Sequence, residues 1–573
     1  METTQAFRPD ALDRAAGMPT MCAAFQATVA EHADRVALRT KGDEARITWG
    51  EYGDRVRRLA AGLHALGLRR GDTLALMLTN RPEFHLVDAA AMHLGAVPFS
   101  IYNTSTPEQA EFLLRDSGAR IAVVEPSFRD RVRTEHVFTV EQLSELEARG
   151  ERSDLDFDAA WRAVQPDDML TLIYTSGTTG DPKGVQITHR NMASTGRSYD
   201  TLIGFRRAGD VVSYLPMAHI AERNCSHYFP MMFAFRVTCV PDARQVASYF
   251  PDVRPAWFFA VPRIFEKLKA AIEAGADDRL REAIGRGLAR VRGEDGPEPD
   301  EQVLAGLRER LGLDRLQALN VGAAPTPPEV IQFFHAIGLP LGELWGMSET
   351  TGLGTCNPRE RIKFGTVGPP SPGVQIRLAG DGEIEVRGEC VTPGYRNRPD
   401  LTAEAFTDDG WLRTGDIGAF DEDGYLSIVD RKKELIINAA GKNMSPANIE
   451  SRLKAASPLV GSAIAIGDRR PYNVALIVLD PDGAGAFARE HGLGDRPVSE
   501  LATEPPVLAA LDEAVQRANG KLSNVEQIKR FRVLATEWQP GGDELTPTMK
   551  LKRRPIAEKY AEEIEGLYGA GRA

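Results

Sequence analysis

A segment rich in threonine, serine and glycine follows an apolar run and ends near a lysine. It reads Thr175-Ser176-Gly177-Thr178-Thr179-Gly180-Asp181-Pro182-Lys183-Gly184, and the apolar run is Met169–Tyr174. Hydroxyl groups donate hydrogen bonds to phosphate oxygens, glycines let backbone N–H groups approach an anion, and Lys183 adds a point charge. The segment is therefore a candidate loop for a polyphosphate tail. A flexible linker is the alternative interpretation.

The order of these residues differs from two familiar phosphate-binding motifs. A Walker A loop has Lys after Gly and before Ser or Thr, whereas Lys183 follows Pro182 and precedes Gly184. No Gly-x-Gly-x-x-Gly occurs in the chain, which argues against a dinucleotide fold of the usual kind. Thr175–Gly184 instead resembles the phosphate-loop signature of the adenylate-forming superfamily of acyl-CoA synthetases, luciferases and peptide-synthetase adenylation domains. The resemblance implies a catalytic Lys183, a metal contact at Thr175, and ATP contacts by Thr175, Ser176, Gly177, Thr178, Thr179 and Gly180.

Further motifs resemble this superfamily in the expected order, over nearly the whole chain. Trp345-Gly346-Met347-Ser348-Glu349-Thr350 looks like its aromatic-Gly-x-Thr/Ser-Glu motif. Trp345 offers a flat face to a purine, and Ser348 offers a hydroxyl to the nucleotide phosphate or the acyl carbonyl. Glu349 offers a hard oxygen ligand for Mg²⁺ near the phosphates, so it is a candidate for both metal binding and catalysis. Trp345, Gly346 and Ser348 are thus expected to contact ATP.

Three more segments complete the nucleotide site that the resemblance implies. Gly322-Ala323-Ala324 is expected to line the adenine pocket. Trp411–Asp416 looks like the superfamily's Gly-Asp signature, and the Asp416 carboxylate can accept hydrogen bonds from both ribose hydroxyls. In the charged cluster Asp430–Glu434, Arg431 is a donor for ribose or phosphate oxygens. Taken alone, a turn aspartate and a solvated charge run would be the simpler interpretations.

Two expectations follow for the region after Arg431. In the superfamily, the residue two positions later is the hinge on which the C-terminal domain rotates, and here that residue is Lys433. Ala440, Gly441 and Lys442 match the turn that approaches the pantetheine arm of coenzyme A. Long-chain fatty acyl-CoA synthetases share the spacing of this turn, although glycine is common where Ala440 stands.

A basic segment near the C-terminus resembles the superfamily's catalytic-lysine segment. Leu545–Arg554 contains four cations within five residues, in an otherwise acidic chain. The resemblance makes Lys550 the residue that enters the active site during adenylation, with Lys552 as the candidate if the register is off by two. A basic surface that attracts anionic lipid is the alternative.

Two strings point to a subfamily. Tyr214–Arg223 and Val261–Lys267 look like sequences found in long-chain fatty acyl-CoA synthetases. By this resemblance His219 lies beside the acyl carboxylate. A hydrogen-bonded core histidine is the equally weighted alternative.

The elements that must position these groups can be predicted from hydrophobic patterning. Short apolar runs at Thr73–Leu78, Ala96–Ile101 and Ile121–Glu125 alternate with helical patterns at Pro82–Leu94 and Glu108–Asp116. Such alternation predicts βαβ units and a mostly parallel sheet.

The domain organisation follows from a change in composition. Glycine and proline become dense over residues 365–394, where short alternating runs predict a small antiparallel unit, and a new α+β pattern begins at Glu434. We therefore predict an α/β fold of the adenylate-forming type. It has a large N-terminal region of several subdomains (1–432), a hinge at Lys433, and a small mobile C-terminal α+β domain (434–573).

Composition excludes several classes of protein. The chain has 573 residues and a net charge of −12, and this acidic balance argues against a dedicated nucleic-acid binder. No apolar run is long enough to span a membrane, and the N-terminus lacks a signal-peptide pattern. Five cysteines without a Cys-x-x-Cys pair favour neither disulfides nor a zinc site. We expect a cytoplasmic protein and leave open peripheral membrane contact and a homodimer.

Together these features predict an AMP-forming acyl-CoA ligase. It would activate a fatty acid, expected to be long-chain, with ATP and Mg²⁺ and transfer the acyl group to coenzyme A. One alternative is a stand-alone fatty acyl-AMP ligase or an adenylation enzyme that loads a carrier protein. Another is an inactive binding protein of the same fold, against which the full set of matching motif residues argues.

Overall fold

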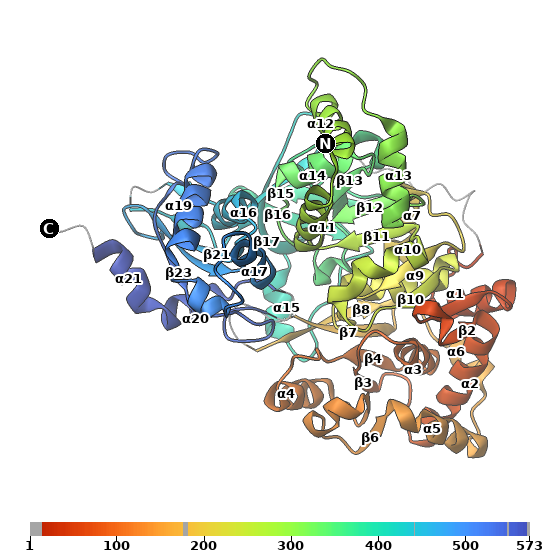
Figure 1. Cartoon of the computed structure of the whole chain (residues 1–573). Helices are drawn as coiled ribbons and strands as arrows, with labels where there is room; N and C mark the ends of the chain where they lie inside the picture. The colour runs from red at the N-terminus through yellow and green to blue at the C-terminus, as the bar shows by residue number, and fades with distance from the viewer. Residues whose placement is uncertain (1–13, 176–180, 440–441, 547–548, 570–573) are drawn as a thin grey trace.

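The computed structural model describes residues 14–175, 181–439, 442–546 and 549–569. The fold is mixed α/β, with a large N-terminal part coloured red to cyan and a smaller C-terminal part in blue at one side of it (Figure 1).

The first sheet of the large part has six strands in the order β6-β5-β3-β4-β7-β8. They are β3 (Thr73–Met77), β4 (Val97–Ser100), β5 (Ile121–Val124), β6 (His136–Thr139), β7 (Met169–Thr175) and β8 (Lys183–Thr188). The strands are parallel except for the antiparallel pair β7 and β8. Helices α3 (Pro82–His93) and α4 (Pro107–Ser117) connect consecutive strands, as the alternation in the sequence predicts.

Local sequence signals explain where such a helix begins and ends. In α4, Thr106 and Gln109 form a reciprocal capping box, and Pro107 occupies the first turn. Gly118 ends the helix with φ +77°, a conformation that favours glycine.

Two further sheets complete the central region. One has the order β2-β1-β10-β9 and the other the order β11-β12-β13-β14. Their strands are β1 (Val36–Arg39), β2 (Arg46–Thr48), β9 (Asp210–Ser213), β10 (Arg236–Cys239), β11 (Trp257–Ala260), β12 (Ala318–Val321), β13 (Leu341–Trp345) and β14 (Thr355–Cys356). Strands β11, β12 and β13 are parallel, so their carboxyl ends meet at one edge, where ligands usually bind in such sheets.

An antiparallel sheet follows in the glycine- and proline-rich region, as predicted. Its order is β15-β16-β17-β18. The strands are β15 (Val374–Leu378), β16 (Glu383–Gly388), β17 (Leu412–Phe420) and β18 (Leu426–Arg431).

The small domain has its own sheets and its own core. Strands β19 (Ile436–Ile437) and β20 (Asn443–Met444) pair with each other, and β21 (Val460–Ile466), β22 (Asn473–Leu479) and β23 (Ile528–Leu534) form a three-stranded sheet. Its helices are α16 (Pro446–Ala456), α17 (Pro481–Glu490), α18 (Val498–Leu501), α19 (Pro505–Asn519), α20 (Arg553–Lys559) and α21 (Ala561–Gly569). Apolar side chains pack on both faces of β22.

The remaining α-helices belong to the large part. They are α1 (Met21–His32), α2 (Trp49–Ala65), α5 (Leu143–Arg149), α6 (Phe157–Arg162), α7 (His189–Ile203), α8 (Ile220–Glu222), α9 (Phe229–Phe233), α10 (Phe250–Val253), α11 (Pro262–Ala274), α12 (Asp278–Val291), α13 (Glu301–Leu311), α14 (Pro328–Ala336) and α15 (Pro399–Ala405). Within the described ranges, no helix combines the length and the apolar character needed to cross a bilayer.

Candidate active site

The candidate phosphate loop joins two antiparallel strands. β7 ends at Thr175 and β8 begins at Lys183, and these two residues face each other in the strand register. The loop therefore closes a hairpin, with Thr175 and Lys183 at its base. Ser176, Gly177, Thr178, Thr179 and Gly180 lie outside the described residues.

Lys183 and Glu349 meet at Tyr395, a residue that the motifs did not single out. The Tyr395 hydroxyl donates a hydrogen bond to Glu349 Oε1 over 2.9 Å, and Lys183 Nζ lies 5.1 Å from the centre of the Tyr395 ring. Tyr395 reaches this position because its neighbour pairs with β8, where the Arg396 N–H donates to the Gly184 carbonyl. Burial and the Glu349 charge raise the pKa of Tyr395, so the phenol keeps its proton.

Glu349 has the chemistry of a magnesium ligand. Its carboxylate is buried, and Oε1 accepts the Tyr395 bond, which leaves lone pairs on both oxygens for a cation. Across the described part of the chain, no group of three His, Cys, Asp or Glu side chains could hold a metal ion by itself. Proteins bind Mg²⁺ with one or two carboxylates together with substrate phosphates and water, and Glu349 offers one such carboxylate. The half-buried Thr175 supplies a hydroxyl at the hairpin base.

Trp345, Asp416 and Arg431 form one hydrogen-bonded unit. The indole N–H of Trp345 donates to Asp416 Oδ2 over 2.8 Å, and Arg431 Nε lies 3.1 Å from Asp416 Oδ1. Asp416 on β17 faces Arg431 on β18 in the strand register. Each carboxylate oxygen retains a lone pair, so Asp416 can still accept ribose hydroxyls. Gly354 packs against the indole, where a Cβ atom would come within 2.5 Å of the ring.

The segment after β12 lies beside the strand that carries Trp345. A Cβ atom on Gly322 would lie 2.8 Å from the Leu344 carbonyl oxygen, so the close approach requires glycine. Ala323 has φ +68°, a left-handed conformation that costs a non-glycine residue about 1–2 kcal/mol. Ala323 and Ala324 are exposed. A strained, exposed turn at the ligand-binding edge of a parallel sheet is consistent with the predicted adenine contact. Gly346 and Ser348 are half-buried and follow Trp345 at the same edge.

His219 lies directly before α8 and caps it. Its Nδ1 accepts a hydrogen bond from the Ala221 N–H over 3.2 Å, which makes Nε2 the protonated nitrogen of the neutral ring. Burial and the Lys550 charge lower the pKa of His219 to about 4, so the ring is neutral at pH 7. A neutral Nε2–H can donate to the carboxylate of an acyl substrate.

Lys550 belongs to the small domain, and charged groups of the large domain affect its pKa. Removal from bulk water lowers the pKa of Lys550, the Arg431 charge lowers it further, and Asp416 and Glu349 raise it. Although charged protein groups lie near Lys550, the residue as a whole is exposed to solvent. Thr546 Oγ1 accepts the Lys550 backbone N–H over 3.0 Å, whereas the ammonium has no ion-pair partner among the described residues.

The other cations of this basic segment are used within the protein. Lys552 Nζ donates to the Gly542 carbonyl over 2.8 Å, and Arg553 forms a bidentate pair with Glu450. Arg554 pairs with Glu558 one helical turn away. Lys552 is therefore tied to the backbone of the small domain, whereas Lys550 is exposed.

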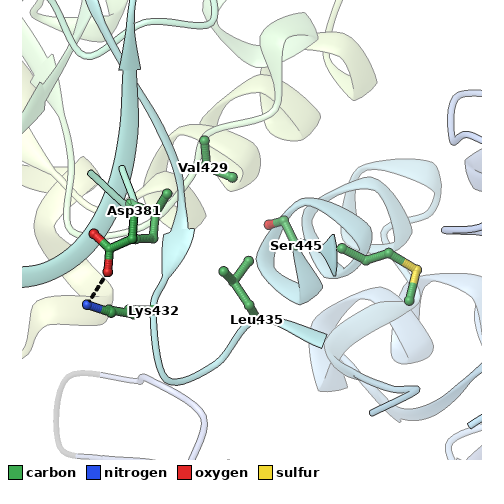
Figure 2. Close-up of a pocket in the computed structure, with 7 residues that line it drawn as sticks. Asp381, Val429, Lys432, Leu435 and Ser445 are labelled. Carbon is green, nitrogen blue, oxygen red and sulfur yellow. Dashed lines mark ion pairs between the residues drawn. The ribbon is translucent and has the colours of Figure 1, made fainter. Parts of the chain in front are cut away.

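Lys433 lies in the turn between β18 and β19. On one side of it, Lys432 pairs with Asp381 of the large domain over 2.5 Å, and on the other, Glu434 pairs with Arg553 of the small domain over 3.1 Å. Lys433 itself is exposed, and no described residue forms an ion pair with it. A cavity of about 240 Å³ lies against this turn (Figure 2). Its lining residues are Asp381, Ile417, Val429, Lys432, Leu435, Met444 and Ser445.

Comparison with known proteins identifies the family of this chain. Residues 25–396 match the family described as AMP-binding enzyme, and residues 433–572 match the family of the AMP-binding enzyme C-terminal domain. The chain belongs to the AMP-binding enzyme family.

Two mycobacterial relatives and one solved structure illustrate the similarity. FadD11 of Mycobacterium tuberculosis, which carries the name of a fatty-acid–CoA ligase, is 50% identical over 448 residues, covering 75% of this chain and 78% of FadD11. The long-chain-fatty-acid–CoA ligase FadD15 of Mycobacterium bovis is 35% identical over 561 residues, covering 91% and 92%. The O-succinylbenzoate CoA synthetase MenE from Bacillus subtilis, solved in complex with ATP and magnesium ion, has a TM-score of 0.68 at 23% identity, over 93% of this chain and 98% of MenE. This likeness confirms the predicted fold class.

In this AMP-binding enzyme, the predicted coenzyme A turn lies at the tip of the β19–β20 hairpin. The Lys442 backbone N–H donates to Asn438 Oδ1 over 2.9 Å, and Lys442 is exposed. Ala440 and Gly441 lie outside the described residues.

Glu343 is a candidate site residue that lies outside the sequence motifs. Burial raises its pKa to about 7, and the Thr326 backbone and hydroxyl act in the opposite direction. It stands two residues before Trp345 on β13, so both side chains lie on one face of the sheet. Side chains two positions apart in a strand share a face, so the position of Glu343 relative to Trp345 could have indicated it from the sequence.

Proposed function

We propose that this member of the AMP-binding enzyme family is an ATP-dependent, AMP-forming fatty acid–CoA ligase whose substrate is a long-chain fatty acid. The observation that carries the proposal is the hydrogen-bonded unit of Trp345, Asp416 and Arg431 beside the Glu349–Tyr395 pair. The charges of Arg431, Asp416 and Glu349 also act on the pKa of Lys550 from the small domain. The names of the mycobacterial relatives support the fatty acid and coenzyme A as substrates.

In the first step, a carboxylate oxygen of the fatty acid attacks the α-phosphorus of ATP. The bond from that phosphorus to pyrophosphate breaks, and an acyl-adenylate forms. Negative charge increases on the phosphate oxygens, so catalysis is mainly positioning and electrostatic stabilisation. Lys183 and Lys550 supply positive charge from the two domains, and His219 donates to the acyl carboxylate.

The nucleoside is held by other groups of the large domain. Trp345 offers its ring to the adenine beside Gly322–Ala324, and Asp416 accepts the ribose hydroxyls while Arg431 fixes its orientation. Glu349 and Thr175 would hold Mg²⁺, which when bound neutralises phosphate charge. The remaining hairpin residues, Ser176–Gly180, are proposed to bind the phosphates on the basis of sequence.

In the second step, the coenzyme A thiolate attacks the acyl carbonyl, and AMP leaves. The thiol needs the space that Lys550 occupies, so the small domain (434–573) must rotate relative to the large one (1–432). We place the hinge at Lys433 and the pantetheine contacts at Ala440, Gly441 and Lys442. A cytoplasmic location and a homodimer stay predictions from the sequence.

The test is product formation by the purified chain. We expect pyrophosphate release with ATP, Mg²⁺ and a fatty acid, and AMP together with acyl-CoA when coenzyme A is added. A series of acyl chains should give the highest kcat/KM for long ones. Acyl-adenylate that accumulates without reacting with coenzyme A would favour an acyl-AMP ligase or a carrier-loading enzyme, and no turnover with any chain length would contradict the proposal.

A further inference from the structure

Two cations on helix α11 of the large domain contact the start of helix α17 in the small domain. Arg263 pairs with Asp480, and Lys267, one helical turn later, lies 2.7 Å from Asp482. Glu266 on the same helix holds the Arg263 guanidinium from the side, at 3.1 Å. Both cations belong to the Val261–Lys267 string, which has no role in the proposed nucleotide site.

A second contact between the domains has the opposite polarity. Glu329 on α14 of the large domain pairs with Lys521 of the small domain, and Arg452 on α16 lies 3.8 Å from the same carboxylate. The large domain thus presents cations at one place and an anion at the other. A different rotation of the small domain would separate these pairs or place like charges together, so the charge pattern selects one orientation.

The α11 contact is connected to Lys550 through the core of the small domain. Asp480 directly follows β22, and its side chain accepts the Gly483 N–H at the start of α17. The face of β22 that packs against the C-terminal segment contacts Leu545 and Leu551. These two leucines pair across the turn that carries Lys550. Because this sheet and turn share one packed core, fixing the end of β22 also fixes the position of Lys550.

We propose that Arg263 and Lys267 are positioning residues for adenylation. Their pairs with Asp480 and Asp482 hold the small domain in the orientation that places Lys550 beside Glu349 and Asp416, and these pairs open before the coenzyme A step. This inference rests on the proposed function, and it gives the Val261–Lys267 string a role in domain docking.

The first test is an exchange of charges at the more exposed pair, because both side chains can change there without disturbing the core. Exposed ion pairs are individually weak, so we expect Lys267→Glu to slow pyrophosphate release about three- to tenfold. Thioester formation from pre-made acyl-adenylate should keep its rate or rise. The double variant Lys267→Glu/Asp482→Lys should restore adenylation to within about twofold of the wild type.

A matched control lies on the same helix. Lys269 pairs with Glu273 within α11, over 2.7 Å, and not with the small domain. Lys269→Glu should therefore leave both half-reactions unchanged. Equal loss in the two half-reactions, no rescue by the double variant, or the same effect from Lys269→Glu would overturn the proposal.

A second test does not depend on turnover. A carbodiimide joins an amine and a carboxylate that are in contact, so treatment of the wild-type chain should link Lys267 to Asp482, as found by mass spectrometry of the peptides. No such link in the wild type would overturn the docking contact. A link in a chain that adenylates no fatty acid would support the contact while contradicting the proposed function.

Discussion

In the large domain, the groups that we propose to bind the nucleotide are held by one another. Trp345 donates to Asp416, and Tyr395 donates to Glu349 from a segment that pairs with β8. In the small domain, Lys550 is held through its backbone, and its ammonium has no ion-pair partner in the described part of the chain. The large domain therefore presents a preformed surface, whereas the position of Lys550 depends on how the small domain docks. Substitutions in this surface should slow adenylation directly. Substitutions that disturb docking should change the rates of adenylation and thioester formation by different factors.

The largest effect on the preformed surface should come from Glu349→Gln, which keeps the shape and removes the charge. We expect adenylation to fall about a hundredfold or more, or about 2.7 kcal/mol, the scale of one electrostatic catalytic group. Pyrophosphate release across a Mg²⁺ series measures it. Glu389→Gln, at an exposed position, is the control. Activity within a few-fold of the wild type at every Mg²⁺ concentration would show that Glu349 does not bind the metal ion.

Lys433→Pro tests domain docking, and it should affect the two half-reactions differently. Proline fixes φ near −65°, so a hinge at this position could not change its dihedrals between two orientations. We expect adenylation to persist and acyl-CoA formation to fall on the order of tenfold or more. Lys433→Ala keeps the dihedral freedom and serves as the control, and a thermal melt checks folding. Equal retention of both activities would place the hinge elsewhere.

Tyr395→Phe tests whether the surface is held together as the contacts indicate. It removes a hydrogen bond to a charged group, so a loss of about 1.5 kcal/mol, or about tenfold in adenylation, is expected. The Mg²⁺ concentration for half-maximal rate should rise. Tyr425→Phe removes a hydroxyl that donates to the Arg361 carbonyl away from this unit and should have little effect. Equal behaviour of the two variants would mean that Tyr395 does not position Glu349.

The smallest expected effect is on the pH profile. In the proposed mechanism, the cationic form of Lys550 is the active one. Because its pKa is lowered, Lys550 loses this charge at a lower pH than a free lysine does as the pH rises. Wild-type adenylation should therefore decline a few-fold at alkaline pH. Arginine stays charged over this range, so Lys550→Arg should move the decline to higher pH. Superimposable alkaline limbs would show that Lys550 does not set the profile.

Much of the fold and part of the site can be predicted from sequence. The strands and helices between Thr73 and Val124 follow from hydrophobic alternation, and Glu349, Asp416 and Lys550 stand in motifs with short spacings. The Trp345–Asp416 hydrogen bond joins residues 71 positions apart, so it depends on how two sheets pack. Tyr395 reaches Glu349 through pairing with β8, and Arg263 reaches Asp480 through domain docking. Local patterns contain no information on such long-range contacts.

The most direct test of the central claim is the pair of half-reactions in Lys550→Ala. If the small domain delivers Lys550 to a preformed surface for adenylation, single-turnover pyrophosphate release should fall to background. Thioester formation from synthetic acyl-adenylate and coenzyme A should stay close to the wild-type rate. Equal loss in both half-reactions would make Lys550 structural, and adenylation at the wild-type rate would contradict the account.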